Sequence, residues 1–207
     1  RKRIDRQNVR AASFTIASCY HIRERMIEAY DVYPNVIYCG VDEKIFRLIK
    51  NEDRDKFLYI GSPDVPEDGY DLVKSALEYI PMSIRPKIHI ISWKKRNGER
   101  LSEKELLKIY SESLVTLCTS RFETFGLVPL ESMACEVPVI ATKVSGHRET
   151  IIDGTTGFLV DCDPKEIAEK IMIFLNNKEF SIKLGRNGRT WIEKKWTWKK
   201  KINDLDN

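Results

Sequence analysis

The stretch TSRFETFGLVPLESMAC, residues 119–135, leads from an apolar strand through a polar loop into a helix. Pro129 suits the first turn of that helix, because the N–H that proline lacks would be unpaired there in any case. In open sheets of parallel strands, ligands bind beyond the carboxyl ends of the strands, where this loop would lie. The stretch therefore predicts an α/β fold and places a binding site within it.

Short apolar strands and amphipathic helices alternate along the rest of the chain, which is the pattern of a parallel sheet covered by helices. We predict a Rossmann-like, doubly wound α/β fold with helices on both faces of the sheet. The expected strands are residues 57–60, 87–92, 114–119, 137–142 and 157–160. The expected helices are residues 70–79, 102–110, 126–135, 164–175 and 179–191. Upstream, residues 14–19 and 36–39 are candidate strands around a helix at 22–30.

Composition and charge narrow the class of protein. The 207 residues are 42% hydrophobic and 32% charged, which is typical of a globular chain. No apolar run approaches the roughly 18 residues that span a bilayer, and a net charge of +4 is too small to indicate nucleic-acid binding. The sequence begins without Met and has no apolar core of a secretory signal, so we expect a fragment of a longer, cytoplasmic protein.

Cysteine and histidine usage favours neither disulfides nor metal. The five cysteines are an odd number, widely spread and without a C-x-x-C pair, which indicates a reducing compartment. The three histidines are scattered without the spacing of metal ligands. We therefore expect no metal site.

Both ends of the chain are basic. The cations are Arg1, Lys2, Arg3, Arg6 and Arg10 at one end and Lys194, Lys195, Lys199, Lys200 and Lys201 at the other. One interpretation is a set of solvated helix faces. The other is attraction to a phosphate-bearing substrate or to an anionic membrane surface, where each cation adds about 1 kcal/mol. The second interpretation predicts peripheral contact with the cytoplasmic face of a membrane.

The loop of the opening stretch has the features of an anion site bordered by acids. The N–H groups of Phe125, Gly126 and Leu127 precede or begin a helix, and such groups attract anions. Glu123 lies on the loop and Glu131 about one turn into the helix, so both can face one crevice. Carboxylates would repel a phosphate but suit sugar hydroxyls beside it. The alternative is that Glu123 is a surface residue and Glu131 a partner of the helix dipole.

These residues resemble a known family. The segment ETFGLVPLE, residues 123–131, is similar to the two-glutamate motif of family 4 of the glycosyltransferases, which have the GT-B fold. The likeness extends to VSGHRE at 144–149 and DGTTGFLV at 153–160, and to WTW at 196–198, where the family usually has Phe-Ser-Trp. Upstream, residues 17–18 and 40–42 resemble the family's junction between its two domains. The resemblance covers nearly the whole chain.

The resemblance implies the C-terminal, nucleotide-sugar-binding half of a retaining, metal-independent glycosyltransferase. Glu123 would take the catalytic position and bind hydroxyls of a mannose- or glucose-type donor, and Glu131 would bind the ribose. The amides of Thr124, Phe125, Gly126 and Leu127 would hold the sugar and the diphosphate of a UDP- or GDP-sugar. Gly61 would border the phosphates at a strand end. The acceptor would be a glycan or a lipid-linked sugar.

The phosphate-binding cations of the family are missing. The family has Arg directly after the glycine at Gly61 and Lys directly before the glycine at Gly69, whereas this chain has Ser62 and Asp68. We expect other cations to substitute, and the candidates are Arg121, Lys94 and Lys95. The alternative is a catalytically impaired relative that acts as a binding or regulatory module. A dinucleotide oxidoreductase is rejected, because the turn at Gly61 lacks G-x-G-x-x-G.

The resemblance also predicts how the chain is divided. Residues 1–52 would be a strand-helix-strand remnant of the interdomain junction with its linker, residues 53–195 the Rossmann-like domain, and residues 196–207 a returning helix or tail. An N-terminal acceptor domain would be missing. The chain alone would then bind donor without transferring sugar.

Overall fold

The computed structural model describes residues 2–49, 54–92 and 101–204. Its centre is a parallel sheet of five strands in the order β4-β3-β5-β6-β7. The strands are β3 (Lys56–Ile60), β4 (Ile88–Ile91), β5 (Ser113–Cys118), β6 (Val139–Thr142) and β7 (Gly157–Val160). The five strands expected for this domain are confirmed. The expected loop at 93–100, with Lys94 and Lys95, lies outside the described residues.

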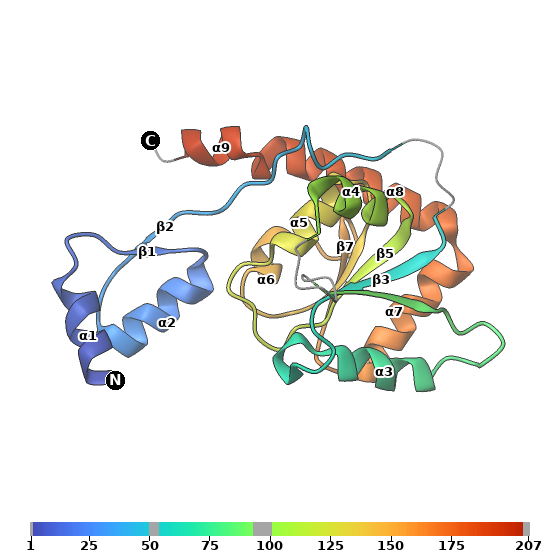
Figure 1. Cartoon of the computed structure of the whole chain (residues 1–207), viewed down its shortest axis with the longest axis horizontal. Helices are drawn as coiled ribbons and strands as arrows, with labels where there is room; N and C mark the ends of the chain where they lie inside the picture. The colour runs from blue at the N-terminus through green and yellow to red at the C-terminus, as the bar shows by residue number, and fades with distance from the viewer. Residues whose placement is uncertain (1, 50–53, 93–100, 205–207) are drawn as a thin grey trace.

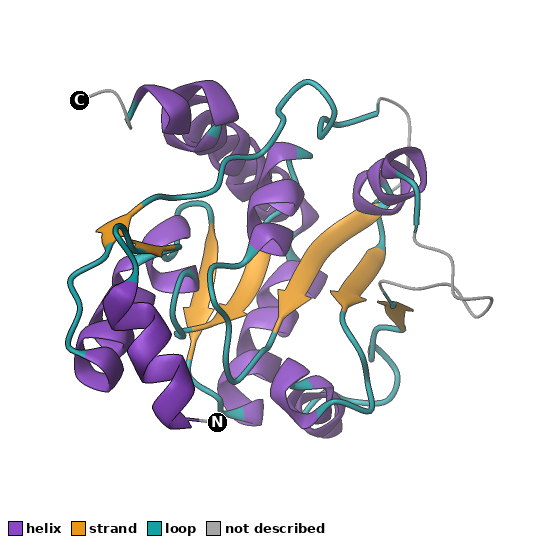
Figure 2. Ribbon diagram, turned by 60° about the vertical axis from the view of Figure 1, so that its left-hand side comes forward, coloured by secondary structure: helices purple, strands orange, loops and turns teal. Residues whose placement is uncertain are grey.

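Helices cover both faces of the sheet, as expected for a doubly wound fold (Figure 2). Side chains of a strand alternate between its faces, and β3 follows this rule. Leu58 and Ile60 belong to one apolar cluster, with residues of α4 and α5, while Phe57 and Tyr59 belong to the other, with residues of α3 and α7. The sheet is therefore a buried central layer between two cores.

Apart from the short helix at residues 147–150, which was not predicted, the described helices of this domain agree with the sequence to within about two residues. They are α3 (Tyr70–Glu78), α4 (Glu103–Ser111), α5 (Leu127–Ala134), α6 (His147–Thr150), α7 (Pro164–Asn176) and α8 (Lys178–Trp191). A capping box begins α4, with the Ser102 N–H donating to the Glu105 carboxylate over 2.8 Å. A 3-10 turn, η1 (Pro66–Asp68), precedes α3, and a π turn, η2 (Ile192–Trp196), follows α8.

An N-terminal lobe, residues 2–36, lies beside the sheet domain (Figure 1). It contains α1 (Lys2–Ala11), β1 (Ile16–Ala17), α2 (Tyr20–Tyr30) and β2 (Asn35–Val36), with β1 and β2 parallel. The expected strand-helix-strand order is confirmed, but each strand has only two residues, and α1 was not predicted.

Glu149 of α6 fastens this lobe to the sheet domain. Its carboxylate accepts hydrogen bonds from the N–H groups of Tyr20 and His21, both at 3.2 Å, and from the Tyr38 hydroxyl at 2.6 Å. The first two donors begin α2, which has no capping side chain of its own. Glu149 therefore caps α2 from across the junction.

The C-terminal segment runs back toward the lobe (Figure 1). The helix α9 (Trp198–Asn203) lies along residues 37–46 in Figure 1, where the Val41 N–H donates to the Trp196 carbonyl over 2.8 Å. The Lys201 ammonium lies over the rings of Tyr38 and Trp196 and pairs with Asp204. Lys201 is thus buried in the packing and does not contribute to the basic surface that the sequence suggested.

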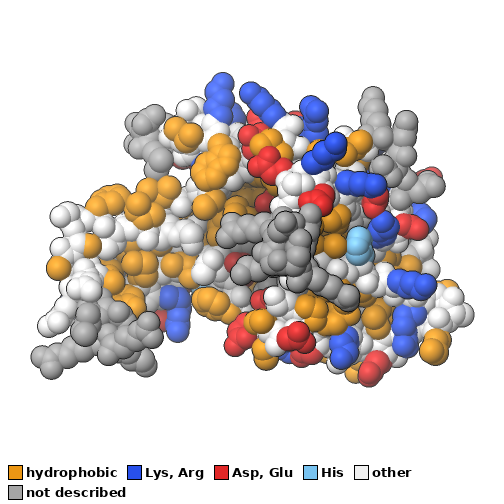
Figure 3. All heavy atoms as spheres, in the orientation of Figure 1, with side chains coloured by type: hydrophobic (Ala, Val, Ile, Leu, Met, Phe, Trp, Pro, Cys, Tyr) orange, Lys and Arg blue, Asp and Glu red, His pale blue; other side chains and the backbone are white. Residues whose placement is uncertain are grey.

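The surface of the lobe is rich in apolar side chains. Figure 3 shows hydrophobic groups gathered over it. Its exposed large hydrophobic residues are Phe14, Ile16, Tyr20 and Tyr33. Within the described ranges, no helix combines the length and apolar character that crossing a membrane requires.

Two glycines of α8 give a matched test of the packing. A Cβ on Gly185 would lie 2.0 Å from the backbone oxygen of Glu136, whereas one on Gly188 would meet the flexible side chain of Met133 at 3.0 Å. Both changes to alanine gain about 1 kcal/mol of helix propensity. We predict that Gly185→Ala lowers the free energy of unfolding in urea by about 1–3 kcal/mol through overpacking, while Gly188→Ala changes it by less than about 1 kcal/mol. Equal effects would contradict this packing.

Candidate functional site

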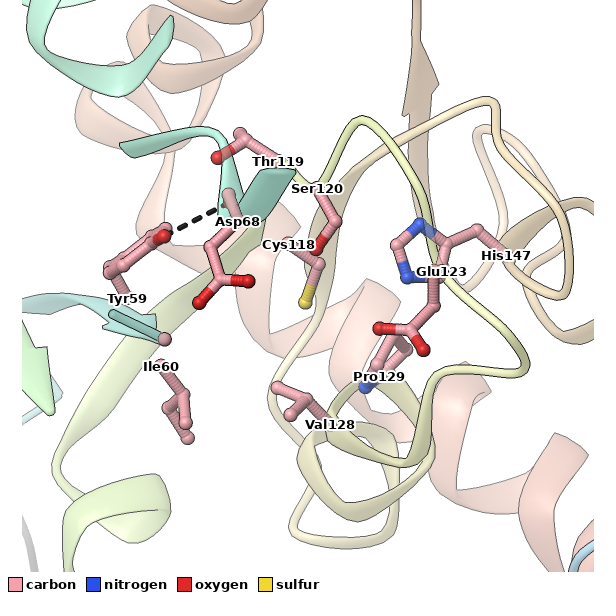
Figure 4. Close-up of a pocket in the computed structure, with 11 residues that line it drawn as sticks. Tyr59, Ile60, Asp68, Cys118, Thr119, Ser120, Glu123, Val128, Pro129 and His147 are labelled. Carbon is pink, nitrogen blue, oxygen red and sulfur yellow. Dashed lines mark hydrogen bonds between the residues drawn. The ribbon is translucent and has the colours of Figure 1, made fainter. Parts of the chain in front are cut away.

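A cavity of about 70 Å³ opens at the carboxyl ends of β3 and β5 (Figure 4). The strands β4 and β5 lie on opposite sides of β3, so the chain goes outward from β3 to β4 and then crosses back to β5. The carboxyl ends of β3 and β5 are therefore the switch point at which doubly wound folds bind ligands. The walls include Gly61, Asp68, Glu123, Pro129 and His147. The cavity holds only part of a nucleotide-sized ligand, since small-molecule pockets are typically about 300 Å³ or more.

Threonine hydroxyls at the strand ends hold the loop of the opening stretch. The Thr119 hydroxyl, after β5, donates to the Gly69 carbonyl at 2.9 Å. The Thr142 hydroxyl, at the end of β6, donates to the Ser120 carbonyl at 2.5 Å. These bonds hold the loop against the segment before α3 and against the end of β6, so the sheet fixes the position of the loop.

The start of α5 is left open to a ligand. Its N-cap is Gly126, with φ 92° and without a capping side chain among the described residues. Any side chain here would collide with His147, because a Cβ would lie 2.8 Å from the imidazole Cδ2. The first amides of a helix need acceptors from outside the helix. Glycine therefore leaves the start of α5 without a side-chain cap, while Gly126 and Leu127 are not among the described residues that line the cavity.

Glu123 occupies part of this amide site itself. Its Oε1 accepts from the N–H of Thr124 at 2.8 Å and from that of Phe125 at 3.4 Å. The expectation that the Phe125 N–H is free is therefore wrong for this structure. The loop binds a carboxylate where an anionic or hydroxyl-bearing ligand was expected. A ligand that uses these amides has to displace Glu123.

Glu131 lies near the cavity without lining it. Its Oε2 accepts from the Tyr110 hydroxyl at 2.8 Å. Burial raises the pKa of Glu131 to about 7, and the Tyr110 bond opposes that rise. The Cys118 thiol lines the cavity, and its pKa is raised first by burial and then by the charges of Glu123 and Glu131. Both acids thus surround one end of β5, although only Glu123 faces the cavity.

Arg121 is turned away from the cavity, contrary to the sequence-based expectation. Its guanidinium binds both carboxylate oxygens of Asp71, at 2.7 and 2.5 Å, and the Pro66 carbonyl at 2.7 Å. A guanidinium held this way on α3 has its charge already neutralised. Leu127 is 45% exposed and Thr124 is exposed as well, and neither is among the described residues that line the cavity.

The charge of the cavity is set by acids. Asp68 lines it, with its Oδ2 accepting from the Ser62 N–H at 2.7 Å. Of the described residues that line the cavity, none is Lys or Arg. Asp68 therefore holds its own strand-end loop in place where the family's pattern has a cation.

His147 is the site residue that sequence reasoning missed. It is 1% exposed, and its Nδ1 lies 3.0 Å from the Thr142 carbonyl. Burial lowers its pKa, opposed by the Thr142 bond and the charge of Glu123. Gly146 allows this placement, since a Cβ there would lie 2.1 Å from the Phe125 carbonyl oxygen. A lone histidine without ligand spacing gave no signal of this in the sequence.

In the part of the chain that the structure describes, no three His, Cys, Asp or Glu side chains group in a way that could hold an ion.

Comparison with known proteins identifies the family. Residues 98–191 match the model described as glycosyl transferases group 1. MJ1178 of Methanocaldococcus jannaschii, an uncharacterized glycosyltransferase, is 36% identical over 179 residues, covering 80% of this chain and 50% of that protein. The chain belongs to the group 1 glycosyltransferases, as its motifs suggested. It spans about half the length of this relative.

Two solved structures share the fold. Sucrose-phosphate synthase from Thermosynechococcus elongatus has a TM-score of 0.84 at 22% identity, over 99% of this chain and 59% of that one. Anabaena HepE, solved in complex with UDP and glucose, has a TM-score of 0.78 at 17% identity, over 95% of this chain and 62% of that one. The fold expected from the sequence, the Rossmann-like C-terminal half of a GT-B protein, is confirmed.

The raised pKa of Glu131 predicts a stability that depends on pH. In the folded state the carboxyl group of Glu131 has a pKa of about 7, against an ordinary value of 4.5. Protonated Glu131 therefore contributes fully to the stability of the fold below pH 4.5, and this contribution is lost as the pH rises toward 7. Glu131→Gln keeps an acceptor for Tyr110 and cannot ionise. We predict that the free energy of unfolding of Glu131→Gln equals that of the wild type near pH 4.5 and exceeds it by up to about 3 kcal/mol at pH 8.

The measurement is urea unfolding of both proteins across that pH range. A difference that is the same at both ends would show that Glu131 does not titrate as described.

Proposed function

We propose that this chain is the donor-binding domain of a retaining glycosyltransferase that moves a mannose- or glucose-type hexose from a nucleotide sugar to a glycan or lipid-linked acceptor. The carrying observation is the uncapped start of α5 at the switch point, whose neighbouring amides already bind the carboxylate of Glu123. A site that binds one anion through backbone donors suits the diphosphate of a donor.

The proposed division of labour follows from the chemistry of each group. The amides at Thr124, Phe125 and the start of α5 stabilise the diphosphate as the bond from the anomeric carbon to its phosphate oxygen breaks. The acceptor oxygen bonds to the same face of that carbon and passes its proton to the departing phosphate oxygen, and the nucleoside diphosphate leaves. Glu123 turns from the amides to the sugar hydroxyls. No divalent metal is required in this scheme.

Glu131 is proposed to bind the ribose hydroxyls. Ligand hydroxyls donate to a carboxylate and favour its ionised form. The pKa of about 7 means that Glu131 is partly protonated in the empty site near neutral pH. Tyr110 holds one oxygen of the carboxylate, which leaves the other oxygen for the ribose.

HepE supports this proposal, because its structure was solved with UDP and glucose. The small cavity also agrees with a site shared between two domains, since about 70 Å³ is only a part of the volume that a nucleotide sugar needs. We propose that a separate acceptor domain supplies the other wall and covers the apolar lobe surface. This chain alone would then bind donor without transferring sugar.

A second candidate is a catalytically impaired binding or regulatory module. The observation that favours it is the acidic cavity, where Asp68 and Glu123 line the wall and Arg121 is engaged by Asp71. Such a module would bind nucleotide sugars without turnover even when joined to its acceptor domain. Release of nucleoside diphosphate by the joined protein separates the two candidates.

We propose that the protein acts in the cytoplasm, at the cytoplasmic face of a membrane. Lys194, Lys195, Lys199 and Lys200 are exposed at the C-terminal end and would contribute the attraction to anionic lipid. Flotation with vesicles of anionic and of neutral lipid tests this contact.

Changing Glu123 is predicted to move two affinities in opposite directions. Glu123→Gln removes a carboxylate that competes with the diphosphate for the Thr124 and Phe125 amides, so UDP should bind at least as tightly as to the wild type. The same change replaces charge-assisted bonds to the sugar, worth about 1.5–3 kcal/mol, so UDP-glucose should bind at least tenfold more weakly. GDP and GDP-mannose form a parallel pair.

Calorimetry with the four ligands is the measurement. The control is Glu179→Gln, which neutralises an exposed acid in the first turn of α8. A parallel loss of UDP and UDP-glucose affinity in Glu123→Gln would contradict the assignment of Glu123 to the sugar. A wild-type chain that binds none of the four would contradict the proposed function.

A further inference from the structure

His147 brings a buried imidazole to the same point as Glu123. A Cβ built on Gly126 would lie 3.0 Å from the His147 Nε2 and 3.5 Å from the Glu123 Cγ. Both side chains line the cavity, and Figure 4 shows them next to each other above the start of α5. His147 is 1% exposed, so its ring is held by the protein and not by solvent.

The hydrogen bond at Nδ1 fixes the form of the ring. A carbonyl oxygen only accepts, so the contact with the Thr142 carbonyl at 3.0 Å requires the proton on Nδ1. Burial lowers the pKa of His147, which favours the neutral ring. The Nε2 then carries a lone pair and no proton. Nothing in the described part of the chain donates a hydrogen bond to it.

Two acceptors that face each other need donors from a ligand. A neutral Nε2 and the Glu123 carboxylate cannot hydrogen-bond to one another, since neither has a proton to donate. Both side chains line the cavity, and a hexose in it supplies neighbouring hydroxyls, each with one proton to donate. Phosphate, which only accepts once ionised, leaves this need unmet.

We propose that His147 is a specificity-determining residue of the donor site, whose Nε2 accepts a hydrogen bond from a hexose hydroxyl adjacent to one bound by Glu123. This inference rests on the proposed function and assigns the side chain that reads the sugar. The His147–Glu123 pair then selects donors with two neighbouring hydroxyls at this position and rejects those that lack one.

Two conservative variants separate recognition from packing. His147→Asn places an amide N–H where Nδ1 donates to Thr142 and leaves nothing at the position of Nε2. His147→Gln can reach an amide oxygen to that position. We expect His147→Asn to lose about tenfold in affinity for UDP-glucose with the UDP affinity unchanged, and His147→Gln to recover most of that loss.

The monodeoxy forms of UDP-glucose identify the hydroxyl. One deoxy form should bind the wild type about tenfold more weakly than UDP-glucose does. The same deoxy form and UDP-glucose should bind His147→Asn equally well, because this variant has no acceptor for the hydroxyl that the deoxy form lacks. The same comparison with GDP-mannose and GDP covers the other donor class. Circular dichroism spectra that match the wild type confirm that each variant is folded.

Three results would overturn the proposal while leaving donor binding in place. The first is an unchanged ratio of UDP-glucose to UDP affinity in His147→Asn. The second is an equal loss of both affinities, which would assign His147 to the phosphates. The third is a loss in His147→Asn that no deoxy sugar abolishes. Failure of the wild type to bind any nucleotide sugar would instead remove the proposed function itself.

Discussion

The bare end of α5 is the constraint around which the site is built. Gly126 starts this helix without a side-chain cap, and the amides beside it are held by the carboxylate of Glu123. Hydrogen bonds from threonines at the ends of β5 and β6 keep the preceding loop in place. The close approach of Gly146 to Phe125 brings α6 and His147 against the same point. A ligand meets donors whose positions are already set by the sheet.

The electrostatic character of the site follows from that arrangement. Acids line the cavity, and the guanidinium nearest in sequence, that of Arg121, is bound to Asp71. The positive side of the site is therefore made of backbone dipoles, which carry no net charge. Such a site holds an anion through directed hydrogen bonds and discriminates by its acceptors. This is why the sugar, more than the phosphates, is expected to decide which donor binds.

The junction between the two parts of the chain reaches the same loop. The Thr124 carbonyl accepts from the Ser18 hydroxyl at 3.2 Å and from the Cys19 thiol at 3.1 Å, while Glu149 caps α2. The lobe therefore contacts the residue whose N–H binds Glu123. A movement of the lobe would therefore shift the peptide group between Thr124 and Phe125, whose N–H donates to Glu123.

The sequence was sufficient for features that depend on local patterns. Continuous apolar runs predicted the five strands of the sheet, because this signal lies within a few residues of chain. The pairing of Arg121 with Asp71 joins residues 50 positions apart, so its loop position alone suggested a free cation. His147 was missed for the same reason, since its role depends on Gly126 and Thr142 being near. The strands β1 and β2 are shorter than predicted, as strand length depends on the partner strand.

Amide chemical shifts of the chain on addition of UDP-glucose test the central claim most directly. The account predicts that the largest changes fall on residues 124–128, with Gly61 also affected, as the ligand replaces Glu123 at the start of α5. Changes confined to the opposite end of the sheet, around Lys56, Leu114 and Lys178, would contradict it.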